Sequence, residues 1–115
     1  MYRFSYSEIL EDAPETGRER ERYAFDRALS LLRDVERQGL KGAERTEAVG
    51  LVQDLWNVLI ADLLNPENGL PEGLRADLVA IGLWTMREVG EVLSAPERSL
   101  AALIDVNSSI REGLR

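Results

Sequence analysis

Apolar residues recur along the chain at helical spacing, and proline residues divide this pattern into segments. The prolines stand at Pro14, Pro66, Pro71 and Pro96. Because proline is tolerated in the first turn of a helix and disrupts a helix interior, these positions predict helix boundaries. We predict an N-terminal arm over 1–13 and helices over 14–38, 44–64, 71–94 and 96–112. The segments that connect these helices are short, and short connections favour antiparallel packing of neighbouring helices. The expected fold is therefore all-α: a small antiparallel bundle of about four helices in a single domain over 1–115.

The apolar arcs of the predicted helices differ in width. In 14–38 the apolar residues form a stripe roughly 100° wide on an otherwise charged helix, as in an amphipathic surface helix, and Gly39 is expected to end it. In 44–64 they cover roughly 240° of the circumference, and in 71–94 they are again broadly distributed. Such arcs indicate that these two helices are buried by several neighbours or keep apolar surface for a partner.

Glycine and proline residues in the second half of the chain carry two further expectations. Gly82 and Gly90 would each cost about 1 kcal/mol relative to alanine inside a helix, so we expect both to mark sites of close helix approach. Pro96 is expected at the first position of the last helix, after a cap at Ser94 or Ala95.

Two tryptophans and one asparagine fall within the apolar arcs. Trp56 and Trp84 each follow a leucine near the middle of an arc. Burial in the core is the favoured interpretation, since aromatic side chains bury large areas; the alternative is that one tryptophan lines a groove for a partner helix. Asn107 lies within the apolar side of the last predicted helix. Its amide needs hydrogen-bond partners, which a loop backbone, a cap or a polar group of a partner would supply.

The N-terminal arm carries three aromatic residues at alternating positions, Tyr2, Phe4 and Tyr6. This spacing suits either a short strand or an aromatic latch folded back onto the bundle. Docking against the bundle is the favoured interpretation. Partner binding and disorder are the alternatives, since termini are commonly loose unless they are tied down.

The composition of the chain argues against several classes of function. The net charge is −7, and all but one of the 14 basic residues are arginines that alternate with glutamates, so no segregated basic face for nucleic acid is visible. The chain has no cysteine and no histidine, which excludes disulfides, thiol nucleophiles and imidazole zinc sites. No phosphate-binding glycine loop or nucleophile elbow occurs, and Asp54 with Asp62 makes no metal-ligand signature. We therefore expect a non-enzyme that uses no metal and no cofactor.

The chain also lacks the sequence features of a membrane or secreted protein. Its start does not have the charged and apolar regions of a signal peptide. No apolar run approaches the ~18 residues that would suggest a membrane span. A soluble cytoplasmic protein is therefore expected.

Several short motifs stand between positions 51 and 89. They are Leu55-Trp56, Asp62-Leu63, Asn68-Gly69-Leu70-Pro71, Leu74-Arg75-Ala76 and Ile81-Gly82-Leu83-Trp84. Together they resemble the FlaF family of flagellar biosynthesis regulators. The tail over 102–115 is similar to the family's ending, with Ile104, Asn107 and Ile110 in place. The layout upstream, a tyrosine-led arm followed by a proline and a charged helix, is similar too, so the resemblance covers nearly the whole chain.

The resemblance implies a protein needed for flagellin production and export. It also implies that the protein binds flagellin in the manner of a chaperone and acts together with FlbT, a regulator that acts on flagellin mRNA. Flagellin export chaperones in general are small, acidic helical proteins that hold a flagellin helix until secretion. We accordingly expect a partner groove built mainly by 44–64 and 71–94, with a contribution from the arm. Its predicted residues are Tyr6, Trp56, Leu59, Leu63, Leu70, Trp84 and Asn107.

Two other functions stay open beside flagellin binding. One is an RNA-associated post-transcriptional regulator of flagellin expression, which would need a contiguous arginine face. The other is a helical scaffold whose apolar surface is consumed by self-association.

Overall fold

The computed structural model describes residues 14–113, with side chains from residue 19 onward. The helices are α2 (Pro14–Gln38), α3 (Ala43–Leu63), α4 (Glu72–Ser94) and α5 (Ala101–Glu112). No strand occurs within these residues, which confirms the all-α expectation. The predicted arm, with Tyr2, Phe4 and Tyr6, lies outside the described residues.

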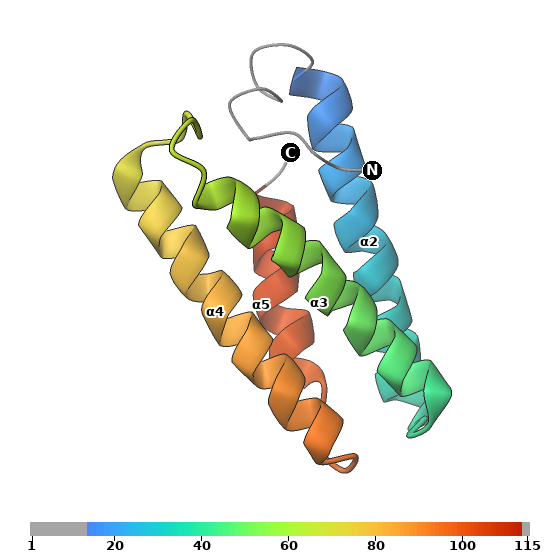
Figure 1. Ribbon diagram of the computed structural model, residues 1–115. Coiled ribbons are helices and arrows are strands. Elements are labelled where there is room, and N and C mark those ends of the chain that lie inside the picture. Colours follow the sequence, from blue (N-terminus) through green and yellow to red (C-terminus); the bar gives the residue numbers. More distant parts are fainter. Residues whose placement is uncertain (1–13, 114–115) are drawn as a thin grey trace.

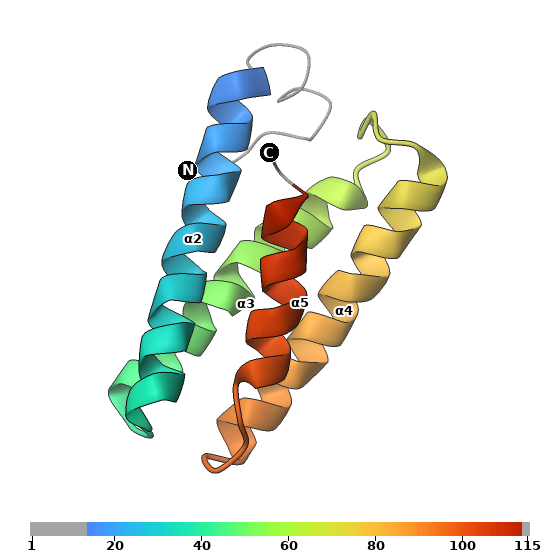
Figure 2. The same ribbon diagram turned by 180° about the vertical axis from the view of Figure 1, so that it is seen from behind.

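The four helices run in alternating directions around a common interior (Figure 1). α3 and α5 lie on opposite sides of the bundle with α2 and α4 between them, as the view from behind also shows (Figure 2). α2 and α4 each pack against both α3 and α5, and the contact between α4 and α5 is the least extensive. The antiparallel arrangement is therefore confirmed.

A glycine ends α2, as its position predicts. Gly39 has a positive φ of 67°, which only glycine adopts without steric cost. The Leu40 N–H donates to the Val35 carbonyl at 3.1 Å, and the Gly39 N–H donates to the Glu36 carbonyl at 3.3 Å. These two bonds form a Schellman motif, which satisfies the last carbonyls of the helix and turns the chain into α3.

Asparagine side chains fix the connection between α3 and α4. Asn68 is buried; its Nδ2 donates to the Asp62 carbonyl at 3.1 Å, and its Oδ1 accepts the Leu70 N–H at 3.0 Å. Asn65 Oδ1 accepts the Glu67 N–H at 2.8 Å, a local turn bond of the kind that asparagine favours. The loop is thus held by its own side chains, and α4 begins directly after Pro71.

The start of α5 differs from the prediction. The last helix was expected from Pro96, but Pro96 lies in a turn and α5 begins at Ala101. The reason is a set of contacts with residues far away in sequence. The buried Arg45 donates from Nη2 to the carbonyls of Val92, Ala95 and Arg98, at 3.1, 3.3 and 2.8 Å.

Glu36 of α2 holds the end of the same segment. Its carboxylate accepts hydrogen bonds from Ser99 Oγ at 2.5 Å and from the Leu100 N–H at 3.0 Å. Ser99 Oγ in turn accepts the Ala101 N–H at 3.0 Å, a local turn bond of the kind that serine makes. Leu100 is fully buried, so this segment is an anchored connector and not the first turn of a helix.

Apolar side chains from the helices and from this connector form one core, which includes Trp56. The cluster comprises Phe25, Ala28, Leu29, Leu32, Val35, Ala48, Val49, Val52, Trp56, Leu59, Val89, Val92, Leu100 and Leu103. The Trp56 ring meets the Phe25 ring edge to face, with centroids 6.2 Å apart. Such aromatic pairs add about 0.5–1.5 kcal/mol beyond the area they bury.

The two helical glycines of α4 have different surroundings. A Cβ atom on Gly82 would lie 2.8 Å from Cε3 of Trp56 and 2.9 Å from Cγ1 of Ile60, so Gly82 is the point where α4 closely approaches α3. This confirms the prediction for Gly82. A Cβ on Gly90 would meet nothing within 4 Å, because Gly90 is exposed, so the same prediction for Gly90 is wrong.

Candidate functional site

A groove of about 670 Å³ lies between α2 and α3. Its lining residues are Arg20, Glu21, Ala24, Arg27, Leu51, Asp54, Leu55 and Val58. They span eight residues on each helix, 20–27 and 51–58, and the first and last of these lie about two turns, or roughly 10 Å, apart. Since the helices are antiparallel, the end of the groove near Arg27 adjoins Leu51 and the end near Arg20 adjoins Val58.

The walls of the groove are aliphatic. Ala24, Leu51, Leu55 and Val58 are all half-buried, so each leaves apolar surface in contact with solvent. Leu51 and Leu55 also pack against the core cluster, whereas Ala24 and Val58 do not belong to it. Exposed apolar surface gathered in a concave site favours association with a complementary apolar surface.

The wide apolar arc of α3 explains why this groove forms. Val52, Trp56 and Leu59 lie on one side of α3 and are buried in the core. Leu51, Leu55 and Val58 extend the arc beyond the core and line the groove. Most of the arc is therefore buried by neighbouring helices, as the first interpretation expects, and the rest remains accessible. That the accessible part serves a partner stays a prediction.

Charged side chains form the rim of the groove, and the two walls differ in sign. Arg20 and Arg27 lie two turns apart on α2, and Asp54 lies on α3. Arg27 and Asp54 are exposed, and neither makes a salt bridge within 4 Å to another residue of the described range. Glu21, also on α2, is buried. The groove thus has an apolar centre between a mainly basic wall and an acidic one.

Ion pairs beside the groove hold α2 in place. Asp26 accepts two hydrogen bonds from Arg111 of α5, at 2.7 Å from Nε and 3.1 Å from Nη2. These bonds lower the pKa of the Asp26 carboxyl below its usual value. Arg33, about two helical turns further along α2, donates to Ser108 Oγ of α5 at 2.7 Å. The α2 wall is therefore fixed from behind by α5.

The structure does not bring the sequence-predicted site residues together on one surface. Trp56, Leu59, Leu63 and Asn107 are at most 2% exposed and lie in the interior, which confirms the core interpretation of Trp56. Trp84 and Leu70 are half-buried, and Trp84 packs against the core cluster. Tyr6 lies outside the described residues. Contact of these residues with a partner stays a prediction.

The exposed leucines of α4 do not gather on one surface. Leu74, Leu83 and Leu93 of α4 are 45%, 48% and 42% exposed. At 100° per residue, Leu74 and Leu83 point about 180° apart, and Leu93 points about 80° away from Leu83. Single exposed leucines that face different directions are ordinary surface features.

The wide apolar arc of the second predicted helix is the one sequence signal that bears on the groove residues. Leu51, Leu55 and Val58 belong to the unusually wide apolar arc of the second predicted helix, but position within the arc does not tell which residues are covered. Ala24 lies in the stripe of the first helix, and Arg27 and Asp54 are typical of a solvated face. Only the packing of α2 on α3 separates the covered residues from the accessible ones.

The described part of the chain contains neither an acidic cluster suited to a metal ion nor a helix suited to a membrane. In residues 14–113 no group of three or more acidic side chains is placed to hold a metal ion. None of the described helices is both long enough and apolar enough to cross a membrane.

A protein-family model matches this chain. The family model described as Flagellar protein FlaF matches residues 2–114, almost the whole length of the chain. No curated protein and no solved structure matches the chain.

Proposed function

The chain belongs to the FlaF family of flagellar proteins, and on this premise we propose that it is a flagellin-binding, chaperone-like regulator of flagellum biosynthesis. In this proposal it acts in the cytoplasm and supports flagellin synthesis and export together with FlbT. It works by binding alone, with no catalytic group, metal or cofactor.

The observation that carries the proposal is the groove between α2 and α3. Its four half-buried aliphatic residues form an apolar site about two helical turns long, bordered by charge. Grooves of this kind bind the apolar face of an amphipathic helix. A chaperone-like protein needs such a site, because it must cover apolar surface that its client would otherwise expose.

The arrangement of the arginines favours a protein partner over RNA. Nucleic-acid binding depends on basic side chains that are available to neutralise phosphates. Here several arginines are engaged within the bundle: Arg33 with Ser108, Arg37 with Asp34, Arg45 with three carbonyls, Arg98 with Glu88 and Arg111 with Asp26. With a net charge of −7 in addition, direct RNA binding is disfavoured, and we assign the contact with mRNA to FlbT.

Isothermal titration calorimetry with purified flagellin tests the proposal. We expect saturable one-to-one binding with a negative heat-capacity change, since apolar surface is buried. The absence of binding, with circular dichroism showing that both proteins are folded, would contradict it.

A gel shift with flagellin leader RNA, with and without FlbT, separates direct RNA binding from recruitment. Light scattering on the protein alone separates flagellin binding from self-association.

A further inference from the structure

We propose that the α2–α3 groove holds an amphipathic helix of the partner in one fixed orientation, with carboxylates of that helix facing Arg27 and a basic side chain facing Asp54. This inference rests on the proposed function, in which the partner is flagellin. It adds the orientation of the bound helix and the charge carried by each of its two flanks.

The walls of the groove favour a helix over an extended segment. Both walls are helices, whose backbone N–H and C=O groups are already paired internally. An extended segment would bring unpaired backbone groups into an apolar site, which costs free energy unless they find partners. A helix satisfies its own backbone groups and offers only side chains to Ala24, Leu51, Leu55 and Val58.

The length of the groove determines how many apolar side chains of the partner helix can contact it. Each wall spans eight residues, and its first and last residues lie about two turns, or roughly 10 Å, apart. A helix of the same length presents apolar side chains at i, i+3 or i+4, and i+7 along one stripe. Three such side chains would cover the aliphatic walls from Leu51 to Val58.

The rim charges set the orientation. Arg27 on α2 and Asp54 on α3 are exposed on opposite walls, and within the described residues they are paired neither with each other nor with a third charge. Arg20 and the buried Glu21 line the same wall, so α2 brings two arginines and one glutamate to the groove and its net charge there is positive. A docked helix therefore meets a basic flank on one side and an acidic flank on the other. Complementary charges at a rim fix register and exclude wrong partners more than they raise affinity.

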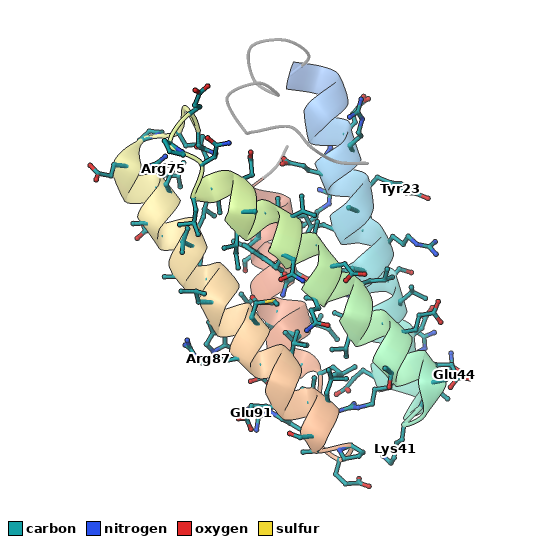
Figure 3. The ribbon with its side chains drawn as sticks, in the orientation of Figure 1. Tyr23, Lys41, Glu44, Arg75, Arg87 and Glu91 are labelled. Atoms are coloured by element: carbon teal, nitrogen blue, oxygen red, sulfur yellow. The ribbon has the colours of Figure 1, made fainter. Side chains whose placement is uncertain are left out.

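Five substitutions test the inference in the full-length chain by calorimetry with purified flagellin at low ionic strength. Val58→Glu places a carboxylate in the apolar wall, and Val58 is not part of the core cluster. Arg27→Glu and Asp54→Arg reverse the two rim charges. The controls are on α4: Leu83→Glu, an exposed leucine outside the groove, and Arg87→Glu, which changes the net charge as Arg27→Glu does. Figure 3 shows Arg87 on the side of α4 that faces away from α2.

We expect Val58→Glu to weaken flagellin binding by about tenfold or more, because it buries an unpaired carboxylate against apolar walls. Arg27→Glu and Asp54→Arg should each weaken it by about three- to tenfold, and this loss should shrink as salt is added. Both control variants should bind within about twofold of wild type, in keeping with the usual behaviour of surface positions outside an interface. Circular dichroism confirms that each variant is folded.

The possible results separate this inference from the proposed function. If wild type does not bind flagellin, the proposed function fails. If wild type binds and Val58→Glu binds equally well, the groove is not the site, although the function stands. If Arg27→Glu has no more effect than Arg87→Glu, the proposed orientation is wrong. If Val58→Glu converts a dimer into a monomer in light scattering without changing flagellin affinity, the groove belongs to a second copy of the chain and the inference is overturned.

Discussion

The indole Nε1 of Trp56 donates a hydrogen bond of 2.6 Å to Oδ1 of Asn107, joining α3 to α5 through the interior of the bundle. Asn107 completes the link by donating from Nδ2 to the Leu103 carbonyl of its own helix at 2.9 Å. Both polar side chains are almost completely buried, and both are satisfied. The link orients the Trp56 ring, which packs against Phe25 and faces Gly82. Through these contacts Trp56 joins all four helices in the interior.

Replacement of Asn107 tests this link. Asn107→Ala should lower the free energy of unfolding by about 2 kcal/mol or more, because it leaves the buried Trp56 N–H unpaired and opens a cavity. Asn57→Ala, at an exposed position of α3, should change it by less than about 0.5 kcal/mol. Urea denaturation of both variants measures the difference. Equal stability of Asn107→Ala and wild type would show that the link contributes nothing.

The two glycines of α4 provide a matched pair. Gly82→Ala should destabilise the bundle by about 1–3 kcal/mol, since its Cβ would lie 2.8 Å from the Trp56 ring, which the Asn107 hydrogen bond keeps in place. Gly90→Ala should stabilise it by about 1 kcal/mol, because a Cβ there meets nothing and alanine is the better helix former. Thermal unfolding of the two variants should shift the midpoint in opposite directions. A shift of the same sign in both would refute the described approach of α4 to α3.

Arg45 should be essential for the connector before α5. Arg45→Ala removes three hydrogen bonds to buried or half-buried carbonyls and should cost about 2–3 kcal/mol. It should also speed amide hydrogen exchange in 95–104, because the connector and the first turn of α5 would lose their anchor. Arg87→Ala, at an exposed position of α4, serves as the control. Unchanged exchange in 95–104 would contradict the anchoring role.

Acid should weaken the bundle through three carboxylates. Hydrogen bonds from Ser99 and Leu100 lower the pKa of Glu36, and Arg98 lowers the pKa of Glu88 as Arg111 lowers that of Asp26. A folded-state pKa below the unfolded value stabilises the fold above the unfolded pKa, and this contribution is lost as the pH falls through the folded value. The ordinary values are 4.5 for the two glutamates and 3.8 for the aspartate.

The free energy of unfolding, measured in urea between neutral pH and about pH 3, should therefore fall most steeply below the ordinary glutamate value of 4.5. Glu36→Gln and Glu88→Gln should each reduce that fall, because glutamine does not titrate, and the double variant should show the shallowest profile. A wild-type profile that stays flat over this range would rule out the stabilising role of these carboxylates.

The helices and several of their ends were predictable because the signals are local. Pro14 and Gly39 bound α2 as expected, and the predicted starts of α3 and α4 differ from the observed ones by one residue. The start of α5 was not predictable in this way. Its signal resembled that of α2, a proline followed by a glutamate, but contacts from Arg45 and Glu36 hold this segment out of helical geometry.

The site was less predictable than the fold, because it depends on which part of an apolar arc is covered. Trp56 and Asn107 are 51 positions apart, and no local pattern pairs them. The sequence suggested a loop backbone, a cap or a partner as the source of hydrogen bonds for Asn107. The observed donor, the indole of Trp56, is none of these. The partner groove was expected between the helices predicted over 44–64 and 71–94, which are α3 and α4 in the structure. These two helices approach closely at Gly82, whereas the observed groove lies between α2 and α3.

Chemical-shift mapping by NMR tests the central claim, that flagellin binds in the α2–α3 groove, most directly. Isotope-labelled protein is titrated with unlabelled flagellin, and the backbone amide shifts are followed along the chain. We predict that the largest changes fall in 20–27 of α2 and 51–58 of α3, while the outer side of α4 around Leu83 and Arg87 stays unchanged. Changes centred on α4, or no changes at a saturating flagellin concentration, would contradict the claim.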